Sequence, residues 1–372
     1  MPVIEIPESL KPVDGRFGCG PSRMRPEQLT AFIDFGSRFM GTSHRQPPIK
    51  NLVGNLKQGL LDMFHAPEGY EIILGNGGAS AFWDAATFSL AEKKAQALVH
   101  GEFGNKFANI LGAPWLQAPT VISVDPGSRG DLKAEAGVDI YAYPQNETSS
   151  GVVTDVRRVI GSEANSLMLT DATSAAGGID FDPLETDAYY FAPQKNLASD
   201  GGLWLALISP KAIERIESVA ASGRYIPNIL SLKLALDNAR QNFTLNTPSL
   251  ATLFFTNNQV EWINSQGGLS WADKRTKTSS ALLYDWAEKN DVTHPFVENS
   301  DHRSQVVATI NFDDSIDALE IAAILRENGI VDTDPYRKLG KNQLRIATFV
   351  STEPAEVEKL IGCIEYVLER IE

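Results

Sequence analysis

The stretch Asp187–Leu207, DAYYFAPQKNLASDGGLWLAL, decides how the chain is interpreted. Its apolar runs at 188–192 and 203–207 predict two neighbouring buried strands, and the polar residues between them predict a loop. That loop carries Lys195 directly after Gln194. A lysine between two core strands either reaches solvent or occupies a pocket that makes its amine nucleophilic. Lysine is mostly exposed in proteins, so a reactive amine is favoured only if other residues supply it with a reaction partner.

Short apolar segments recur on both sides of this stretch and predict a sheet. The predicted strands are 70–74, 97–100, 120–124, 139–143, 166–170, 188–192 and 203–207. Because these runs are apolar throughout, they predict a largely parallel α/β sheet of seven strands that helices cover on both faces. The helices preceding and following the first strand are predicted over 26–39, 49–64 and 81–90.

The chain length predicts two domains, since 372 residues exceed the size of one ordinary core. After Gly268 the pattern changes to a charged helix followed by a strand, a helix, a strand and a final helix. We therefore expect a large domain over 17–262 and a smaller C-terminal α/β domain over 263–372. Residues 1–16 are expected to pack on the small domain.

Composition excludes several classes of function. With 33 basic and 47 acidic residues the net charge is −14, which disfavours a nucleic-acid or anionic membrane partner. No apolar run approaches the ~20 residues that span a bilayer, and the first residues lack the features of a signal peptide. Two cysteines and five scattered histidines give neither a disulfide framework nor a metal-ligand spacing. A cytoplasmic enzyme without a metal is expected.

The glycine-rich segment GNGGAS, residues 75–80, joins a predicted strand to a predicted helix. Backbone amides at such a helix start can hold a phosphate. The spacing is not that of a dinucleotide fingerprint, because the third glycine is replaced by Ser80 and no acidic residue ends the next strand. A phosphate cradle and an ordinary glycine turn are both compatible with this segment.

Asp171 follows the apolar strand 166–170, at the edge of the sheet where open α/β proteins bind ligands. Taken alone it could equally cap the following turn. Together with the glycine-rich segment and Lys195, however, it completes the set that pyridoxal 5′-phosphate needs. That set is a phosphate site, a carboxylate for the ring nitrogen and a lysine for the Schiff base.

Further motifs extend this set along nearly the whole chain. They are FGCGPS, MGTSHR, GNGGAS, QNETSSG, TDATSAAGG, YYFAPQKN, NTPS and QLRIATF. In this order they resemble the phosphoserine aminotransferase family in its actinobacterial form, which belongs to class V and fold type I of the pyridoxal-phosphate enzymes. The resemblance implies amino transfer from glutamate to 3-phosphohydroxypyruvate, giving phosphoserine and 2-oxoglutarate in serine biosynthesis. Some members also act on a related intermediate of vitamin B6 (pyridoxine) synthesis.

The resemblance also implies a role for each cofactor contact. It places the Schiff base on Lys195, the ring-nitrogen carboxylate on Asp171, phosphate contacts on Gln194 and the amides of Ala79 and Ser80, the 3-oxygen contact on Thr148, ring stacking on Phe103, and contacts to the partner subunit's cofactor on Asn246 and Thr247. Many relatives have tryptophan where this chain has Phe103. A homodimer with a shared active site is therefore expected.

On the substrate side, the resemblance assigns the phosphate to His44 and Arg45 and the α-carboxylate to Arg345. An unpaired arginine within an apolar strand would be costly, which independently favours a ligand for Arg345. Many relatives have an arginine in the cradle loop and a His-Arg pair shortly before the carboxylate-binding arginine. This chain has neither, so Arg337 or Lys338 is expected to substitute in contacting the substrate phosphate.

Three alternatives remain at this stage. A cysteine desulfurase would need a mobile catalytic cysteine, and neither Cys19 near the amino terminus nor Cys363 in an amphipathic helix suits that role. An alanine- or serine-glyoxylate transaminase would need no phosphate-binding pair. A non-catalytic Rossmann-like cofactor-binding protein is disfavoured by the missing glycine and by the combination of Lys195 with Asp171.

Overall fold

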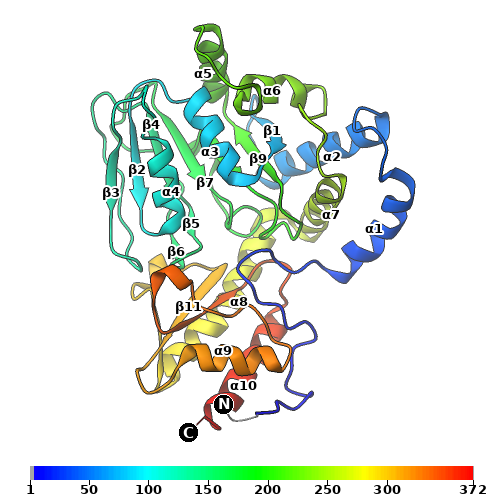
Figure 1. Cartoon of the computed structure of the whole chain (residues 1–372), viewed down its shortest axis with the longest axis vertical. Coiled ribbons are helices and arrows are strands. Elements are labelled where there is room, and N and C mark those ends of the chain that lie inside the picture. The colour runs from blue at the N-terminus through cyan, green and yellow to red at the C-terminus, as the bar shows by residue number, and fades with distance from the viewer. Residues whose placement is uncertain (1–3, 372) are drawn as a thin grey trace.

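A computed structural model describes residues 4–371 (Figure 1). Its largest element is a seven-stranded sheet in the order β1-β9-β8-β7-β4-β2-β3. The strands are β1 (Glu71–Asn76), β2 (Ala95–Val99), β3 (Thr120–Ser123), β4 (Ile140–Pro144), β7 (Leu167–Asp171), β8 (Ala188–Phe191) and β9 (Leu203–Ile208). Strand β9 is antiparallel to both of its neighbours, β1 and β8, and the other pairings are parallel. The predicted seven strands and mostly parallel sheet are confirmed.

Helices cover both faces of this sheet, as the adjacent residues Tyr189 and Tyr190 show. Tyr189 packs edge-on against Phe64 at the end of α2, whereas Tyr190 stacks on Phe82 of α3. Successive side chains of a strand point to opposite faces, so α2 and α3 lie on opposite sides of the sheet. The helices of this part of the chain are α1 (Pro26–Phe39), α2 (Pro47–Met63), α3 (Gly78–Ser89), α4 (Glu102–Ile110), α5 (Pro210–Ala221), α6 (Leu232–Arg240) and α7 (Leu250–Gln266).

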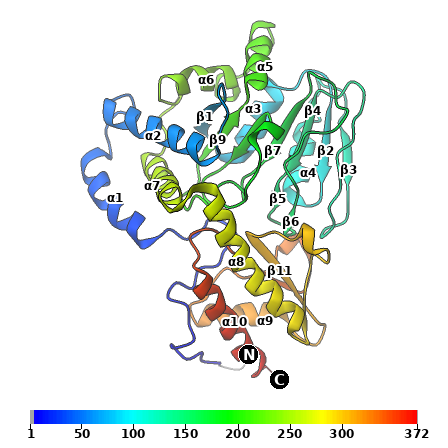
Figure 2. The same ribbon diagram turned by 180° about the vertical axis from the view of Figure 1, so that it is seen from behind.

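A smaller α/β unit lies below the large sheet in Figures 1 and 2. Its antiparallel sheet has the order β10-β11-β12, with β10 (Thr293–Pro295), β11 (Val307–Phe312) and β12 (Gln343–Ala347). Its helices are α8 (Gly268–Lys289), α9 (Ala318–Glu327) and α10 (Pro354–Leu368). Helix α8 runs from the large sheet down along this unit (Figure 2). The domain boundary at 262/263 stays a prediction.

The amino-terminal segment joins the core of the smaller unit. Ile4 and Ile6 are buried there, and the amide of Ile6 donates to Asn328 Oδ1 at 2.8 Å. The short elements that periodicity did not predict are β5 (Asn146–Glu147), β6 (Val152–Val153), β10, η1 (Pro183–Glu185), η2 (Asn228–Leu230), η3 (Ser300–His302) and η4 (Arg337–Leu339). Each is two or three residues long, too short to show a hydrophobic period.

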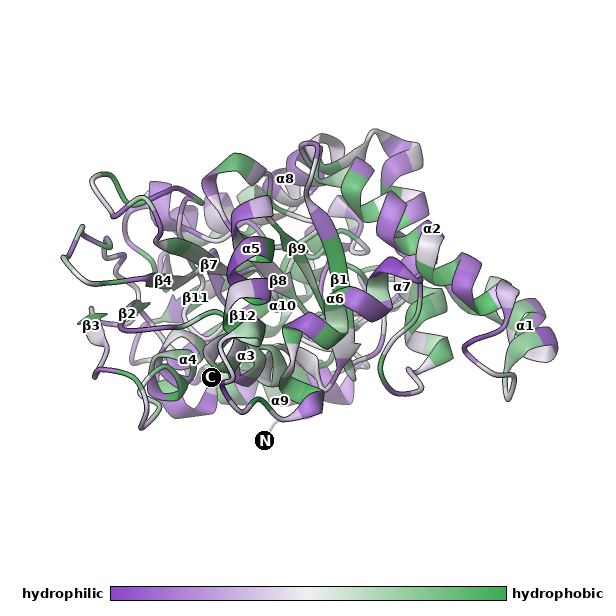
Figure 3. Ribbon diagram, turned by 90° about the horizontal axis from the view of Figure 1, so that it is seen from above, coloured by the Kyte–Doolittle hydropathy of each residue, from purple (hydrophilic) through white to green (hydrophobic). Residues whose placement is uncertain are grey.

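Hydropathy follows this layering (Figure 3): the strands of the large sheet are apolar, and the helices around them alternate apolar and polar positions. The burial of β8 and β9 along their full length explains why their sequences lack a period of two. Within residues 4–371, no helix combines the length and the apolar composition needed to cross a membrane.

The carboxyl and amino ends of the strands in the large sheet carry different residues. β1, β7 and β8 point the same way, since β1 and β8 are both antiparallel to β9 and β7 is parallel to β8. Their carboxyl ends therefore lie on the same side of the sheet, which brings together the glycine-rich segment, Asp171 and Lys195.

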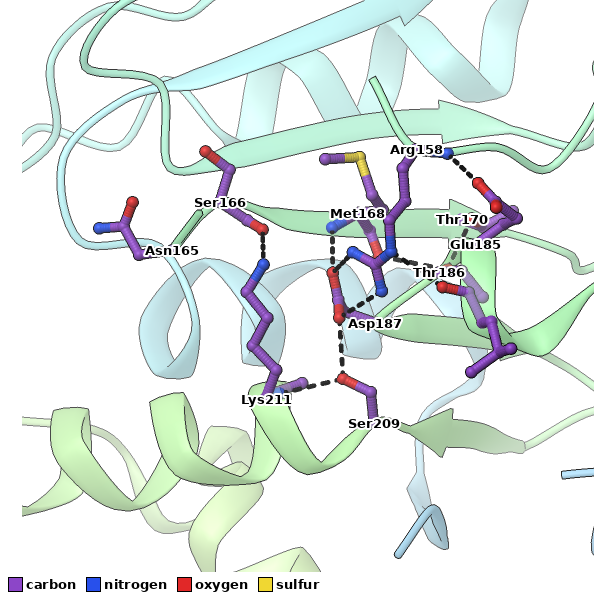
Figure 4. Close-up of polar contacts among 12 residues, drawn as sticks. Arg158, Asn165, Ser166, Met168, Thr170, Glu185, Thr186, Asp187, Ser209 and Lys211 are labelled. Atoms are coloured by element: carbon purple, nitrogen blue, oxygen red, sulfur yellow. Dashed lines mark hydrogen bonds and ion pairs between the residues drawn. The ribbon is translucent and has the colours of Figure 1, made fainter. Parts of the chain in front are cut away.

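At the amino ends of β7 and β8, a network of polar contacts surrounds Asp187, which directly precedes β8 (Figure 4). Its fully buried carboxylate accepts two hydrogen bonds from Arg158, at 2.8 and 3.0 Å. It also accepts from the Met168 amide and the Ser209 hydroxyl, each at 2.9 Å. Lys211 reaches the carbonyl of Ser166 beside this network. All of these contacts are within the chain, so the network joins the starts of β7, β8 and α5.

Candidate active site

Lys195 lies in the loop after β8, and its ammonium is withdrawn from water. Burial lowers its pKa to about 8, with a smaller contribution in the same direction from Arg345. The side chain keeps some exposure because it lines a cavity rather than packing into the core. A lysine with this pKa is partly neutral near physiological pH, which is what a nucleophilic or proton-transferring amine requires. The reactive interpretation of Lys195 is therefore the better one.

A backbone loop near the amino terminus closes over this lysine. The carbonyl of Cys19 accepts a hydrogen bond from Lys195 Nζ, and the amide of Ser22 donates to the carbonyl of Gln194 at 2.8 Å. Gly20 has φ +129°, and a β-carbon there would collide with Lys195. Glycine at this position therefore allows both the backbone conformation and the close approach of the amine.

Asp171 is the last residue of β7, and its carboxylate is surrounded by neutral donors. The Thr173 amide donates to Oδ1 at 2.9 Å, and Trp83 Nε1 donates to Oδ2 at 3.2 Å. Burial raises the pKa of Asp171, and hydrogen bonds from Thr173, Trp83 and Tyr190 oppose that rise. None of residues 4–371 supplies a cation that forms an ion pair with it. The carboxylate can therefore still accept a positively charged group.

The glycine-rich segment forms the amino-terminal end of α3. Gly77 and Gly78 have φ values of +114° and +70°, and the Gly77 amide donates to the carbonyl of Gly202 at 2.9 Å. Helix α3 has no side-chain cap, so its first amides, including those of Ala79 and Ser80, are free of intrahelical partners. Such an end attracts a phosphate.

These groups line a single cavity of about 330 Å³. Its residues are Gly77, Gly78, Ala79, Ser80, Trp83, Phe103, Pro144, Asn146, Thr148, Asp171, Thr173, Ser174, Gln194, Lys195 and Gly202. Two buried polar atoms on this lining, Asn146 Oδ1 and Gln194 Oε1, have no hydrogen-bond partner among the described residues. Buried polar atoms are normally paired, so their presence fits a polar ligand. The amine, the carboxylate and the helix end are those that pyridoxal phosphate requires.

Thr148 and Phe103 also lie on the wall of this cavity. Thr148 Oγ1 donates to the hydroxyl of Ser174 at 2.9 Å, so that hydroxyl is held in place. Phe103 is fixed by the buried carboxylate of Glu147, which accepts from the amides of Phe103 and Gly104 at 3.1 and 3.0 Å. Burial raises the pKa of Glu147. By accepting hydrogen bonds from the first amides of α4, the Glu147 carboxylate fixes the backbone that carries the Phe103 ring.

Arg345, on β12 of the smaller unit, contacts Thr148 of the cavity wall. One of its nitrogens donates to the carbonyl of Thr148 at 3.1 Å, and the guanidinium lies 5.2 Å from the ring centre of Tyr336. Its buried Nε has no hydrogen-bond partner in the described part of the chain, and no acidic side chain there pairs with it. A half-buried guanidinium with a free donor is well suited to hold a carboxylate.

Arg337 and Lys338 do not line the cavity; they are exposed residues of η4, which contacts α4 through Lys338 and Glu102. Lys338 forms an ion pair with Glu102, which raises the pKa of the lysine and lowers that of the carboxyl. Tyr336, directly before them, lies 6.3 Å from the ring of Phe103. Segment 336–338 therefore contacts α4 beside Phe103, which lines the cavity.

The remaining predicted site residues lie away from this cavity. His44 and Arg45 are in the loop between α1 and α2, on the arm that extends from the body of the molecule in Figures 1 and 2. His44 is buried, and burial lowers its pKa, whereas Arg45 is exposed. The carbonyl of Thr247 accepts from Asn76 at 3.2 Å, and Asn246 lines a small separate pocket beside β1.

Comparison with known proteins agrees with this geometry. Residues 21–333 match the model of the "Aminotransferase class-V" family. The chain belongs to the class V aminotransferase family. It is 52% identical to the phosphoserine aminotransferase of Rhodococcus jostii (strain RHA1), with 98% of each chain covered.

Two solved structures illustrate the shared fold. A phosphoserine aminotransferase from Cytophaga hutchinsonii has a TM-score of 0.87, with 23% identity over 96% of this chain and 99% of that one. A phosphoserine aminotransferase from Trichomonas vaginalis, solved with PLP bound, has a TM-score of 0.80, with 18% identity over 94% of this chain and 99% of that one. The fold-type I architecture expected from the resemblance is thereby confirmed.

Several residues of the site had no assigned role in the sequence interpretation. Trp83 appeared there only as part of an apolar helix, and Glu147 only as a letter in QNETSSG. Cys19 and Gly20 were quoted in FGCGPS without a role. A polar residue in a loop motif signals a site, whereas a tryptophan on a helix is ordinarily read as core, so Trp83 gave no signal.

Proposed function

We propose that the chain is a pyridoxal-phosphate-dependent phosphoserine aminotransferase that transfers the amino group of glutamate to 3-phosphohydroxypyruvate. The observation that carries this is one cavity lined by Lys195, Asp171 and the uncapped start of α3. Relatives 52% identical over 98% of the chain bear that enzyme's name. A cysteine desulfurase lacks comparable support because neither cysteine lines the cavity, and a glyoxylate transaminase lacks it because the 52% identical relatives bear the phosphoserine enzyme's name.

The cofactor would be held by residues at the carboxyl ends of β1, β2, β7 and β8. Lys195 would form the Schiff base, and Asp171 would accept a hydrogen bond from the protonated ring nitrogen. The amides of Ala79 and Ser80, with Gln194, would bind the phosphate, and Phe103 would cover the ring. When bound, the cofactor supplies a ring that accepts the electrons of the bond broken at the substrate's Cα.

Lys195 is also the residue suited to move the substrate's α-proton. Its pKa of about 8 lies near the working pH, where a general base is most effective. The carbonyl of Cys19 holds Nζ in place while the amine is free. Phe103 lies on the wall of the same cavity, with its backbone amide held by Glu147.

Two anionic ends of the substrate need two cationic sites. Arg345, which has free donors and no acidic partner in residues 4–371, would bind the α-carboxylate. Arg337 and Lys338 on η4 would contact the phosphate, and Lys338 would first have to leave Glu102. Since the chain carries a net charge of −14, these local cations must overcome an unfavourable global field.

The proposal includes a homodimer. His44, Arg45, Asn246 and Thr247 do not line the cavity of their own chain. A second copy related by twofold symmetry would place them at the partner's cavity, where Arg45 would meet the substrate and Asn246 and Thr247 the cofactor phosphate. The extended α1–α2 arm has the shape to reach a neighbour (Figures 1 and 2).

A half-reaction tests the chemistry. Phosphoserine added to the purified, cofactor-loaded protein should convert the visible absorption band to that of the amine form, and serine at the same concentration should do so far more slowly. Lys195→Ala should lose the visible band. A wild-type protein that stays colourless with added pyridoxal phosphate, or that turns over serine as well as phosphoserine, contradicts the assignment.

A mixed dimer tests the shared site. Lys195→Ala and Arg45→Ala chains should each be impaired with phosphoserine, but a hybrid would pair one intact lysine with one intact arginine in the same cavity. Random mixing makes half of the dimers hybrids with one working site, so about a quarter of wild-type activity should return. No recovery on mixing, with hybrids verified by two affinity tags, would place Arg45 outside the partner's site.

A further inference from the structure

Two side chains beside the carboxylate of Asp171 have no part in the transamination chemistry above. Trp83 comes from α3 and Tyr190 from β8, the strand paired with β7, where Tyr190 stands opposite Asp171 in the register. Both are buried, with 4% and 0% of their surface exposed. Trp83 Nε1 lies 3.2 Å from Asp171 Oδ2 and 3.0 Å from the Tyr190 hydroxyl.

The direction of the hydrogen bonds in this triangle follows from their chemistry. The indole N–H can only donate, so the Tyr190 oxygen accepts from Trp83 and its own proton remains available. Tyr190 stands opposite Asp171 in the β7–β8 pairing and lowers the pKa of that carboxyl, so its proton is available to Asp171. Burial raises the pKa of Tyr190 well above its usual value, so the phenol stays protonated and remains a donor.

Packing fixes both donors in this position. Tyr190 stacks on Phe82 with ring centres 4.4 Å apart, and Trp83 stacks on Phe107 at 6.0 Å. Phe107 also meets the edge of Tyr190 at 5.9 Å. Since Phe82 and Trp83 belong to the helix whose first turn would bind the cofactor phosphate, one rigid element sets the distance between phosphate site and carboxylate.

We propose that Trp83 and Tyr190 are positioning residues that keep Asp171 ionised and fix the direction of its free lone pairs toward the cofactor's ring nitrogen. This rests on the proposed function. Both donors are neutral, so they stabilise the carboxylate without cancelling its charge, and the full negative charge remains for the pyridinium. A cationic partner in their place would compete with the ring nitrogen.

Trp83→Phe tests the proposal, with Trp204→Phe as its matched control. Trp204 is equally buried and packs against Phe82 at 5.2 Å, but the contacts of its indole do not include Asp171. Both variants remove one indole from the same core. Tyr190→Phe, which removes a single oxygen, provides a second test if Trp83→Phe folds poorly.

We expect Trp83→Phe to weaken the binding of pyridoxal phosphate and to slow the phosphoserine half-reaction, each by about tenfold, with the KM for phosphoserine within about twofold of wild type. Losing a donor raises the pKa of Asp171, so the acid limb of the rate profile should move to higher pH by about one unit. Tyr190→Phe should act in the same direction. Trp204→Phe should lower thermal stability by a similar amount to Trp83→Phe but leave cofactor affinity and pH profile unchanged.

The inference is overturned if Trp83→Phe and Trp204→Phe change cofactor affinity and pH profile equally, or if neither Trp83→Phe nor Tyr190→Phe moves the acid limb. A wild-type protein that takes up no pyridoxal phosphate overturns the proposed function and this inference together. A wild type that transaminates normally, with Trp83→Phe variants indistinguishable from the control, overturns the inference alone.

Discussion

Asp171 and Asp187 are buried aspartates at opposite ends of the same pair of strands, and they differ in what surrounds them. Asp187 is neutralised by Arg158 and accepts two further hydrogen bonds, so its capacity is filled within the chain (Figure 4). Asp171 receives hydrogen bonds from neutral donors and forms no ion pair within residues 4–371. A buried carboxylate without a cation is costly. Asp187, which has its cation within the chain, therefore has a structural role, whereas Asp171 is suited to a cationic ligand.

The sharpest test of this contrast is Asp171→Asn. The amide keeps the shape but cannot carry the charge that the ring nitrogen needs, so the rate of the phosphoserine half-reaction should fall at least about a hundredfold. The free energy of unfolding of the apoprotein should fall by only about 1–2 kcal/mol, because one buried donor loses its acceptor but no ion pair is lost and a buried charge is removed. Denaturant titration alongside the half-reaction measures both. Large unfolding losses in this variant would make Asp171 structural as well.

Asp187→Asn should give the opposite result. It leaves Arg158 without its partner and disturbs two buried donors, so the free energy of unfolding should fall by about 2–4 kcal/mol. At a temperature where the variant is folded, its affinity for pyridoxal phosphate should equal that of wild type. Asp182→Asn is a control in the same loop between β7 and β8. Among the described residues, the Asp182 side chain accepts a hydrogen bond only from the Leu184 amide, at 2.9 Å, so this variant should lose no more than about 1 kcal/mol of unfolding free energy. Equal costs for the two variants would refute the structural role of Asp187.

The amine facing Asp171 gives a third test, through pH. The pKa of Lys195 is lowered to about 8 by burial, and only the neutral amine condenses with the cofactor's aldehyde. The rate at which the apoprotein takes up pyridoxal phosphate should therefore rise about tenfold per pH unit below 7 and level off above about 8. A rate that keeps rising to pH 10 would mean that the ammonium is solvated. Stopped-flow absorbance measures it.

How far the sequence could predict this molecule follows from the kind of signal each part carries. The strands and the positions of Asp171 and Lys195 were predictable, because continuous apolar runs mark buried strands and ligands bind at their carboxyl ends. The contrast between Asp171 and Asp187 was not, since both flank apolar strands and only the distant Arg158 distinguishes them. The role of Trp83 could not be predicted for a related reason. Its hydrogen bond to Asp171, 88 positions away, produces no pattern in the local sequence.

The smallest expected effect concerns Glu102, whose carboxylate, unlike those of Asp171 and Asp187, is not buried. Glu102 pairs with Lys338, so its carboxylate occupies a cation that the substrate phosphate would use. Glu102→Gln should free Lys338 and lower the KM for phosphoserine about threefold, an effect that added salt should weaken because the pair is exposed. The KM for serine should stay the same, since serine carries no phosphate. If the KM for phosphoserine rises instead, Glu102 holds Lys338 in position for the phosphate rather than competing with it.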